Sequence, residues 1–128
     1  MRRPKVLLIL LLAGTAIIAQ GCATIKAGAS GTMAYIRGKL RTVEPRDINI
    51  VYAATEKALK ELELNVSQKT KDAMSAKIVA RDSQYKKVTI SLGATSEDTT
   101  KLSIQVGMFG SERKSRLIYE KIKENLPK

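Results

Sequence analysis

Apolar and polar residues alternate in five stretches of the chain. The alternation occurs in residues 33–43, 66–70, 76–81, 87–92 and 101–106. Alternation with a period of two is typical of a strand that buries one face and exposes the other. A set of such strands predicts an antiparallel sheet that is wetted on one side.

Two further stretches place apolar residues three and four positions apart, which is typical of an amphipathic helix. The first covers residues 48–63, with Asp47 as the expected N-cap. The second follows Ser111, a second expected N-cap, and ends before Pro127. The inward stripe of the first helix is expected to be Ile48, Val51, Tyr52, Thr55, Leu59 and Leu62. That of the second is expected to be Leu117, Ile118, Ile122 and Leu126.

The element order is therefore β-α-β-β-β-β-α. We expect an α+β fold in which both helices cover the apolar face of one antiparallel sheet of about five strands. Gly38 lies within the first stretch and suggests a bulge there. In that stretch one face is expected to hold Ala34, Ile36, Leu40 and Thr42. The other face is expected to hold Tyr35, Arg37, Lys39 and Arg41.

The N-terminus has the order of an export signal. Three basic residues precede an apolar run from Val6 to Ala19, and small residues follow up to Cys22. The run is shorter than the roughly 20 residues that span a membrane. The sequence therefore predicts a signal peptide over residues 1–21. An uncleaved N-terminal anchor with an incidental thiol is the alternative.

Residues 19–22, Ala-Gln-Gly-Cys, resemble the lipobox of bacterial lipoproteins. The resemblance implies that Cys22 receives a diacylglycerol and that a peptidase cuts before it. Residues 22–32 are then the lipidated cysteine and a small, glycine-rich tether, and residues 33–128 are the folded domain. We expect a membrane-anchored protein of the cell envelope. Ala23 in place of Asp favours the outer membrane, facing the periplasm.

Composition restricts the chemistry. The chain has one Cys and no His, so it has no internal disulfide, no His/Cys zinc site and no Ser-His-Asp triad. We expect no metal, no cofactor and no enzymatic activity. Ser111 and Lys114 do match the S-x-x-K pattern of serine-lysine hydrolases, but that chemistry needs a buried, neutral lysine. We therefore interpret Ser111 as a helix cap and Lys114 as a solvated side chain.

The formal net charge of +11 suggests an anionic partner. Without residues 1–21 the charge is +8. The candidate patch for such a partner consists of the strand cations Arg37, Lys39, Arg41, Lys77 and Arg81, with Lys87 and Lys101 beside them. Anionic lipid, an anionic glycan or another envelope protein would suit it. Nucleic acid is not expected, since aromatic residues are only 4% and no stacking platform is present.

Four segments together resemble a known family. They are residues 31–38 (GTMAYIRG), the alanines and leucine of 53–59, residues 71–75 (KDAMS) and residues 103–110 (SIQVGMFG). Over roughly residues 28–122 the chain resembles small bacterial lipoproteins labelled domain of unknown function 3568 (DUF3568). The resemblance implies an exported, lipid-anchored, single-domain protein and implies no activity.

Three hypotheses follow. The favoured one is a lipid-tethered interaction or accessory module that binds through its basic sheet face. The alternatives are a small Ser/Lys envelope hydrolase and a passive lipoprotein that holds a small apolar ligand.

Overall fold

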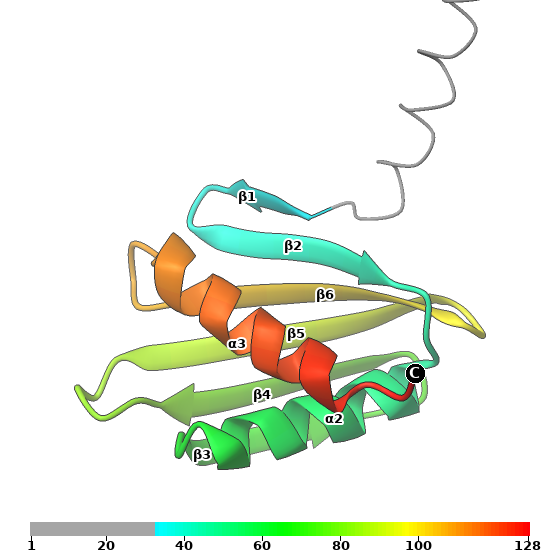
Figure 1. The fold of residues 1–128 in the computed structure, drawn as a ribbon, viewed down its shortest axis with the longest axis horizontal. Helices are drawn as coiled ribbons and strands as arrows, with labels where there is room; N and C mark the ends of the chain where they lie inside the picture. The colour runs from blue at the N-terminus through cyan, green and yellow to red at the C-terminus, as the bar shows by residue number, and fades with distance from the viewer. Residues whose placement is uncertain (1–32) are drawn as a thin grey trace, which may run out of the picture. The chain divides into compact units, whose positions relative to one another are not determined.

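The computed structural model describes residues 33–128, which form one antiparallel sheet of six strands and two helices (Figure 1). The strand order across the sheet is β1-β2-β6-β5-β4-β3. The elements in chain order are β1 (Ala34–Ile36), β2 (Lys39–Glu44), α2 (Ile48–Glu61), β3 (Asn65–Lys71), β4 (Ser75–Arg81), β5 (Lys87–Ser96), β6 (Thr99–Val106) and α3 (Glu112–Asn125). The α+β prediction is confirmed, with one strand more than expected.

The crossover helix α2 explains the strand order. The chain passes from β2 into α2, which runs roughly along the strands, and then enters β3, the edge strand opposite β1; it returns strand by strand through β4, β5 and β6 (Figure 1). The last strand, β6, closes the sheet by pairing with β2. Helix α3 then lies beside α2 on the same face.

The core lies between this face and the two helices. On the sheet side it is aliphatic. The strand residues in the core are Leu40, Ala76, Ile78, Ala80, Val88, Ile90, Leu92, Leu102, Ile104 and Val106. Burial of these side chains removes apolar surface from water. It stabilises the folded state by about 25 cal/mol per Å² buried and is the main driving force for folding.

Both predicted helix caps are confirmed. The Asp47 carboxylate accepts a hydrogen bond from the backbone N–H of Asn49 at 2.7 Å. The Ser111 hydroxyl accepts one from the backbone N–H of Lys114 at 3.3 Å. The two caps satisfy N–H groups that have no partner inside the helix. Neither helix described in residues 33–128 has the length and apolarity needed to cross a membrane.

The predicted inward stripe of α3 is partly wrong. Ile118 and Ile122 are buried, but Leu117 is 58% exposed. The buried residues of α3 are Ser115, Ile118, Tyr119 and Ile122. The helix is turned so that Tyr119 reaches Glu44 on β2, where its hydroxyl donates a hydrogen bond to the carboxylate. This rotation carries Leu117 toward solvent.

The single strand predicted over residues 33–43 is wrong as well. It is a hairpin, β1 and β2, with Arg37 and Gly38 as its two-residue turn. Both turn residues have positive φ, 53° and 79°, as a type I′ turn requires. Gly38 therefore makes a turn rather than a bulge. The turn reverses the faces of β1, so Tyr35 pairs with Leu40 and packs against the core, whereas Ile36 pairs with Lys39.

Candidate functional site

The sheet face that points away from the helices, called the outer face below, carries six cationic side chains. These are Lys39, Arg41, Lys77, Arg81, Lys87 and Lys101. The register aligns them in rows across the strands. Arg41 is paired with Ser103, Ser103 with Ser91, and Ser91 with Lys77. One row of the face therefore has a cation at each end and two hydroxyls between.

No carboxylate balances these charges within the sheet. Glu44 is the one acidic residue in the six described strands, and it is buried on the helix side. The ion pairs formed among residues 33–128 lie elsewhere: Lys69–Glu56, Lys114–Asp82, Arg116–Glu112 and Lys121–Glu124. The outer face is therefore a region of uncompensated positive potential.

The outer face is hollowed over its central strands. A hollow of about 460 Å³ has Arg41, Lys101, Ser91, Gly93 and Ser103 among its lining residues. The absence of a side chain at Gly93 helps to open it, because nothing lies within 4 Å of the position that its Cβ would take. The hollow therefore offers two hydroxyl groups close to two cations.

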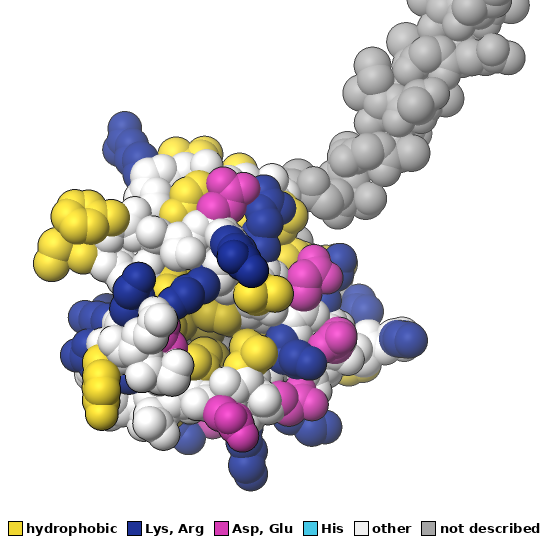
Figure 2. All heavy atoms as spheres, turned by 60° about the vertical axis from the view of Figure 1, so that its left-hand side comes forward, with side chains coloured by type: hydrophobic (Ala, Val, Ile, Leu, Met, Phe, Trp, Pro, Cys, Tyr) yellow, Lys and Arg dark blue, Asp and Glu magenta, His cyan; other side chains and the backbone are white. Residues whose placement is uncertain are grey.

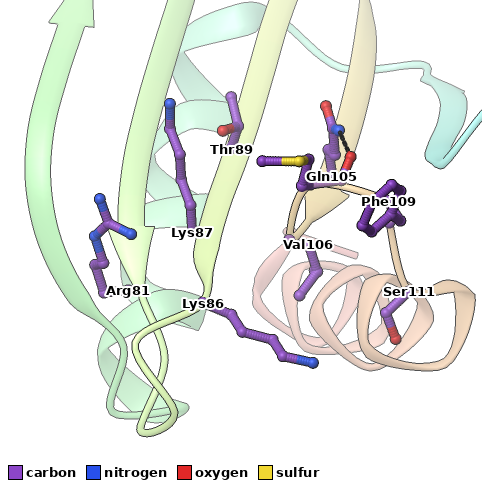
Figure 3. Close-up of a pocket in the computed structure, with 11 residues that line it drawn as sticks. Arg81, Lys86, Lys87, Thr89, Gln105, Val106, Phe109 and Ser111 are labelled. Atoms are coloured by element: carbon purple, nitrogen blue, oxygen red, sulfur yellow. Dashed lines mark hydrogen bonds between the residues drawn. The ribbon is translucent and has the colours of Figure 1, made fainter.

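A second hollow, of about 620 Å³, lies toward the end of the same two strands (Figure 3). Thr89 and Gln105 line it, and on the outer face this pair is the next one along the strands from the Ser91–Ser103 pair. Arg81, Lys86 and Lys87 provide its charge. Met108, Phe109 and Ser111, from the loop before α3, are also among its lining residues.

The structure brings together four of the five predicted patch residues. Lys39, Arg41, Lys77 and Arg81 share the outer face, and Lys87 and Lys101 lie beside them. Arg37 does not belong to that face, because it occupies the β1–β2 turn. Cys22, the predicted lipidation site, lies outside the described residues.

The sequence reasoning missed the contribution of the loops. Lys86, Met108 and Phe109 were not singled out as site residues, although they line the second hollow. The available signal was a Met-Phe pair between Gly107 and Gly110, which places two large apolar residues in a loop.

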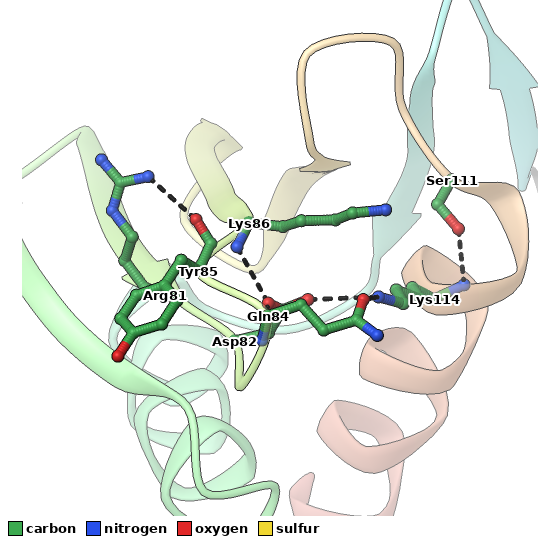
Figure 4. A network of polar contacts seen from close by, with 7 residues as sticks. All are labelled: Arg81, Asp82, Gln84, Tyr85, Lys86, Ser111 and Lys114. Carbon is green, nitrogen blue, oxygen red and sulfur yellow. Dashed lines mark hydrogen bonds and ion pairs between the residues drawn. The ribbon is translucent and has the colours of Figure 1, made fainter.

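The Ser111 hydroxyl and the Lys114 ammonium have different hydrogen-bond partners (Figure 4). The Lys114 ammonium contacts an Asp82 carboxylate oxygen at 3.2 Å and the Gln84 side-chain oxygen at 3.1 Å. The backbone N–H of Lys86 and the Lys114 side chain hold the pKa of Asp82 below its ordinary value. Lys114 thus ties α3 to the β4–β5 loop, while the Ser111 hydroxyl caps the helix. This geometry gives no support to the hydrolase alternative.

For the remaining alternative, an apolar ligand, the described residues offer a crevice on the helix side. A crevice of about 300 Å³ opens between the helices and the end of the sheet, and Leu62, Leu64, Val88, Leu117 and Ile118 are among its lining residues. Within residues 33–128 there is no group of three Cys, Asp or Glu side chains that could hold a metal ion.

Comparison with known protein families assigns the chain to one of them. The family model described as "Protein of unknown function (DUF3568)" matches residues 5–125. The chain belongs to this family. The resemblance seen in the sequence is thereby confirmed for DUF3568, and the match covers both the N-terminal segment and the sheet with its helices. No match was found among curated proteins.

Proposed function

We propose that this DUF3568 protein is a lipid-anchored interaction module of the cell envelope whose outer face binds an anionic envelope polymer. The observation that carries the proposal is the charge of that face. Six cations lie on adjacent strands, and Glu44, the one acidic residue in the described strands, lies on the other face.

The arrangement of these cations favours an extended ligand over a small ion. Arg41 and Lys77 are separated by three strand-to-strand steps, roughly 14 Å at about 4.8 Å per step. Because side chains stand roughly perpendicular to a sheet, a single phosphate or carboxylate group held by one of these cations leaves the other without an anionic partner. A chain with repeated anionic groups can contact both and can hydrogen-bond to Ser91 and Ser103 on the way.

The anchor in this proposal is the thiol of Cys22. Support comes from the sequence of residues 1–22, with its basic start, its apolar run and a cysteine directly after small residues. Two acyl chains on one cysteine would hold the protein at a bilayer stably. The absence of Asp after Cys22 supports the outer membrane, with the folded part facing the periplasm.

Charge reversal on the outer face tests the binding proposal. The variant carries Arg41→Glu, Lys77→Glu and Lys101→Glu. Its matched control carries Lys57→Glu, Lys60→Glu and Lys123→Glu, which change the net charge equally on the two helices. The probe is heparin, used as a soluble anionic polysaccharide, at about 0.1 M NaCl, where charges about 10 Å apart still interact.

We expect the outer-face variant to bind heparin on the order of tenfold more weakly or worse, and the helix variant to bind nearly as well as the parent. Parent binding should weaken as salt is added. Equal losses in the two variants would show that only net charge matters and would overturn the proposal. Undiminished binding by the outer-face variant would do the same. If the outer face retained an envelope protein and bound no polymer, the partner would be that protein, and the polymer proposal would be overturned.

The anchor has its own test. Cells that express the parent or the Cys22→Ser variant are fed a clickable fatty acid and fractionated. We expect the label on the parent only, and loss of the variant from the envelope fraction. An isolated protein that retains Met1, or that has an unmodified Cys22 sulfur by mass spectrometry, would rule out the lipid anchor.

A further inference from the structure

Three large apolar side chains project from one end of the sheet. Phe109 is 90% exposed and Met108 83% exposed, both in the loop between β6 and α3. Tyr85, in the β4–β5 loop, is 83% exposed. The pairing of Val88 with Val106 places both loops at the same end, called the tip below, together with the Arg37–Gly38 turn. Figure 2 shows apolar side chains projecting there, with basic side chains between them.

The loop that presents Met108 and Phe109 is braced from several sides. The Gly107 N–H donates to the Lys87 carbonyl at 2.7 Å, and the Gln105 side-chain amide donates to the Met108 carbonyl at 3.3 Å. Gly110 packs so closely on Gly38 that a Cβ there would overlap with the Gly38 backbone. The fold therefore holds Phe109 in an exposed position, although leaving its large apolar surface in water is unfavourable in free energy.

The surroundings of these side chains are cationic. Arg81, Lys86 and Lys87 line the hollow beside Phe109, and no carboxylate lines it. Asp82, in the β4–β5 loop, forms an ion pair with Lys114. Glu63 lies in the crevice on the helix side of this end. Apolar groups that project beyond a set of basic side chains match the layering of an anionic bilayer, where phosphates lie outside the acyl chains.

We propose that the tip docks on an anionic bilayer surface, with Phe109, Met108 and Tyr85 entering the boundary between headgroups and acyl chains and Lys86 contacting phosphates. A bilayer fits better than a protein pocket, because the apolar groups stand on two separate projecting loops. This contact does not require the proposed polymer site, which uses strand residues. Docking is compatible with an anchor at Cys22. When fully extended, residues 23–32 can span about 33 Å, which exceeds the roughly 27 Å length of the eight-residue β6. A tether of that length would let the tip reach the bilayer that holds Cys22.

Tryptophan fluorescence can test this directly, since the chain has no Trp. Phe109→Trp is introduced into the full chain, which is reconstituted in vesicles of phosphatidylcholine alone or mixed with phosphatidylglycerol. The matched control is Met74→Trp, because Met74 is 62% exposed in the β3–β4 turn at the opposite end of the sheet. Brominated acyl chains serve as the quencher.

We expect the Phe109→Trp emission to shift to shorter wavelength and to be quenched in the phosphatidylglycerol vesicles, while Met74→Trp remains solvent-like. Adding Lys86→Gln should weaken docking roughly fivefold, as expected for loss of one basic residue at an anionic surface. Phe109→Ser should weaken docking on the order of tenfold, measured by the emission of a Tyr85→Trp chain with and without this change.

Other outcomes would overturn the proposal. Solvent-like emission from the Phe109→Trp variant in both vesicle types would do so, and so would an equal response from the Met74→Trp variant. A shift that grows with protein density and ignores lipid charge would indicate a second copy of the chain as the partner. Because the strand cations are unchanged in these variants, such a failure would leave the heparin result standing.

Discussion

At the scale of single residues, glycine positions determine what the loops can present. Gly110 has a φ of +83° and lies against the backbone of Gly38, so it needs both its conformational freedom and its lack of a side chain. Gly93 differs, because it lies in β5 with open space around it. The first glycine is needed for backbone geometry, whereas the second only leaves the outer face hollow.

This difference predicts opposite effects of the same substitution. Gly110→Ala should lower the free energy of unfolding by about 2 kcal/mol or more, from the left-handed conformation and the overlap with Gly38. Gly93→Ala should raise it by about 0.4 to 1 kcal/mol, because alanine restricts the unfolded chain and fits the site. Urea unfolding followed by circular dichroism measures both. Equal effects would contradict the proposed bracing of the tip.

At the scale of elements, the β1–β2 hairpin shows where periodicity misleads. Even-numbered residues are small or apolar on both sides of Arg37 and Gly38, so alternation alone assigns them to one face. A two-residue turn pairs Ile36 with Lys39, and this exchanges the faces of the first strand. The exchange puts Tyr35 in contact with the core and removes Arg37 from the basic face. Gly38 does interrupt the regular strand, but it does so as a turn residue and not as a bulge.

The turn also leads to a stability prediction. Arg37 has a φ of +53°, in a region that non-glycine residues enter at a cost of about 1 kcal/mol and that asparagine tolerates better. Arg37→Asn should therefore raise the free energy of unfolding by about 0.5 to 1 kcal/mol. Arg41→Asn, in the regular part of β2, should bring no such gain. Thermal unfolding of the two variants beside the parent is the measurement, and a loss of stability in the Arg37 variant would argue against the turn.

At the scale of the whole molecule, one buried contact joins distant parts of the chain. The Tyr119 hydroxyl on α3 donates to the Glu44 carboxylate on β2, and both residues are buried. Burial, and then the bond to Glu44, raise the pKa of Tyr119 to about 12. The folded state therefore holds the tyrosine proton more tightly than the unfolded state does.

The linked stability is fully present below pH 10 and is lost as the pH rises toward about 12, because the unfolded chain releases the proton first. Tyr119→Phe should lower the free energy of unfolding by about 2 kcal/mol at pH 8, since Glu44 stays buried without this donor. Between pH 10 and pH 12 the stability difference between parent and variant should shrink. Urea titrations across this range measure it, and a difference that stays constant with pH would contradict the linkage.

Much of the fold follows from the sequence alone. The period of two gave the strands from β3 to β6, and the period of about 3.6 gave both helices with Asp47 and Ser111 as caps. These features are local, because side chains a few positions apart decide which face of an element is apolar. The family assignment also came from local segments in their order along the chain. The predicted signal peptide and lipidation at Cys22 rest on the sequence in the same way.

Tertiary structure decided everything that depends on pairing. The sequence placed Arg41 and Lys77 on outward strand faces, but only the order β2-β6-β5-β4 puts them in one row with Ser103 and Ser91 between. The rotation of α3 toward Glu44, and the bracing of the Met108–Phe109 loop by Gly38, likewise join residues far apart in the chain. Periodicity describes one element at a time, whereas a charged face or a projecting tip exists only once several elements have packed together.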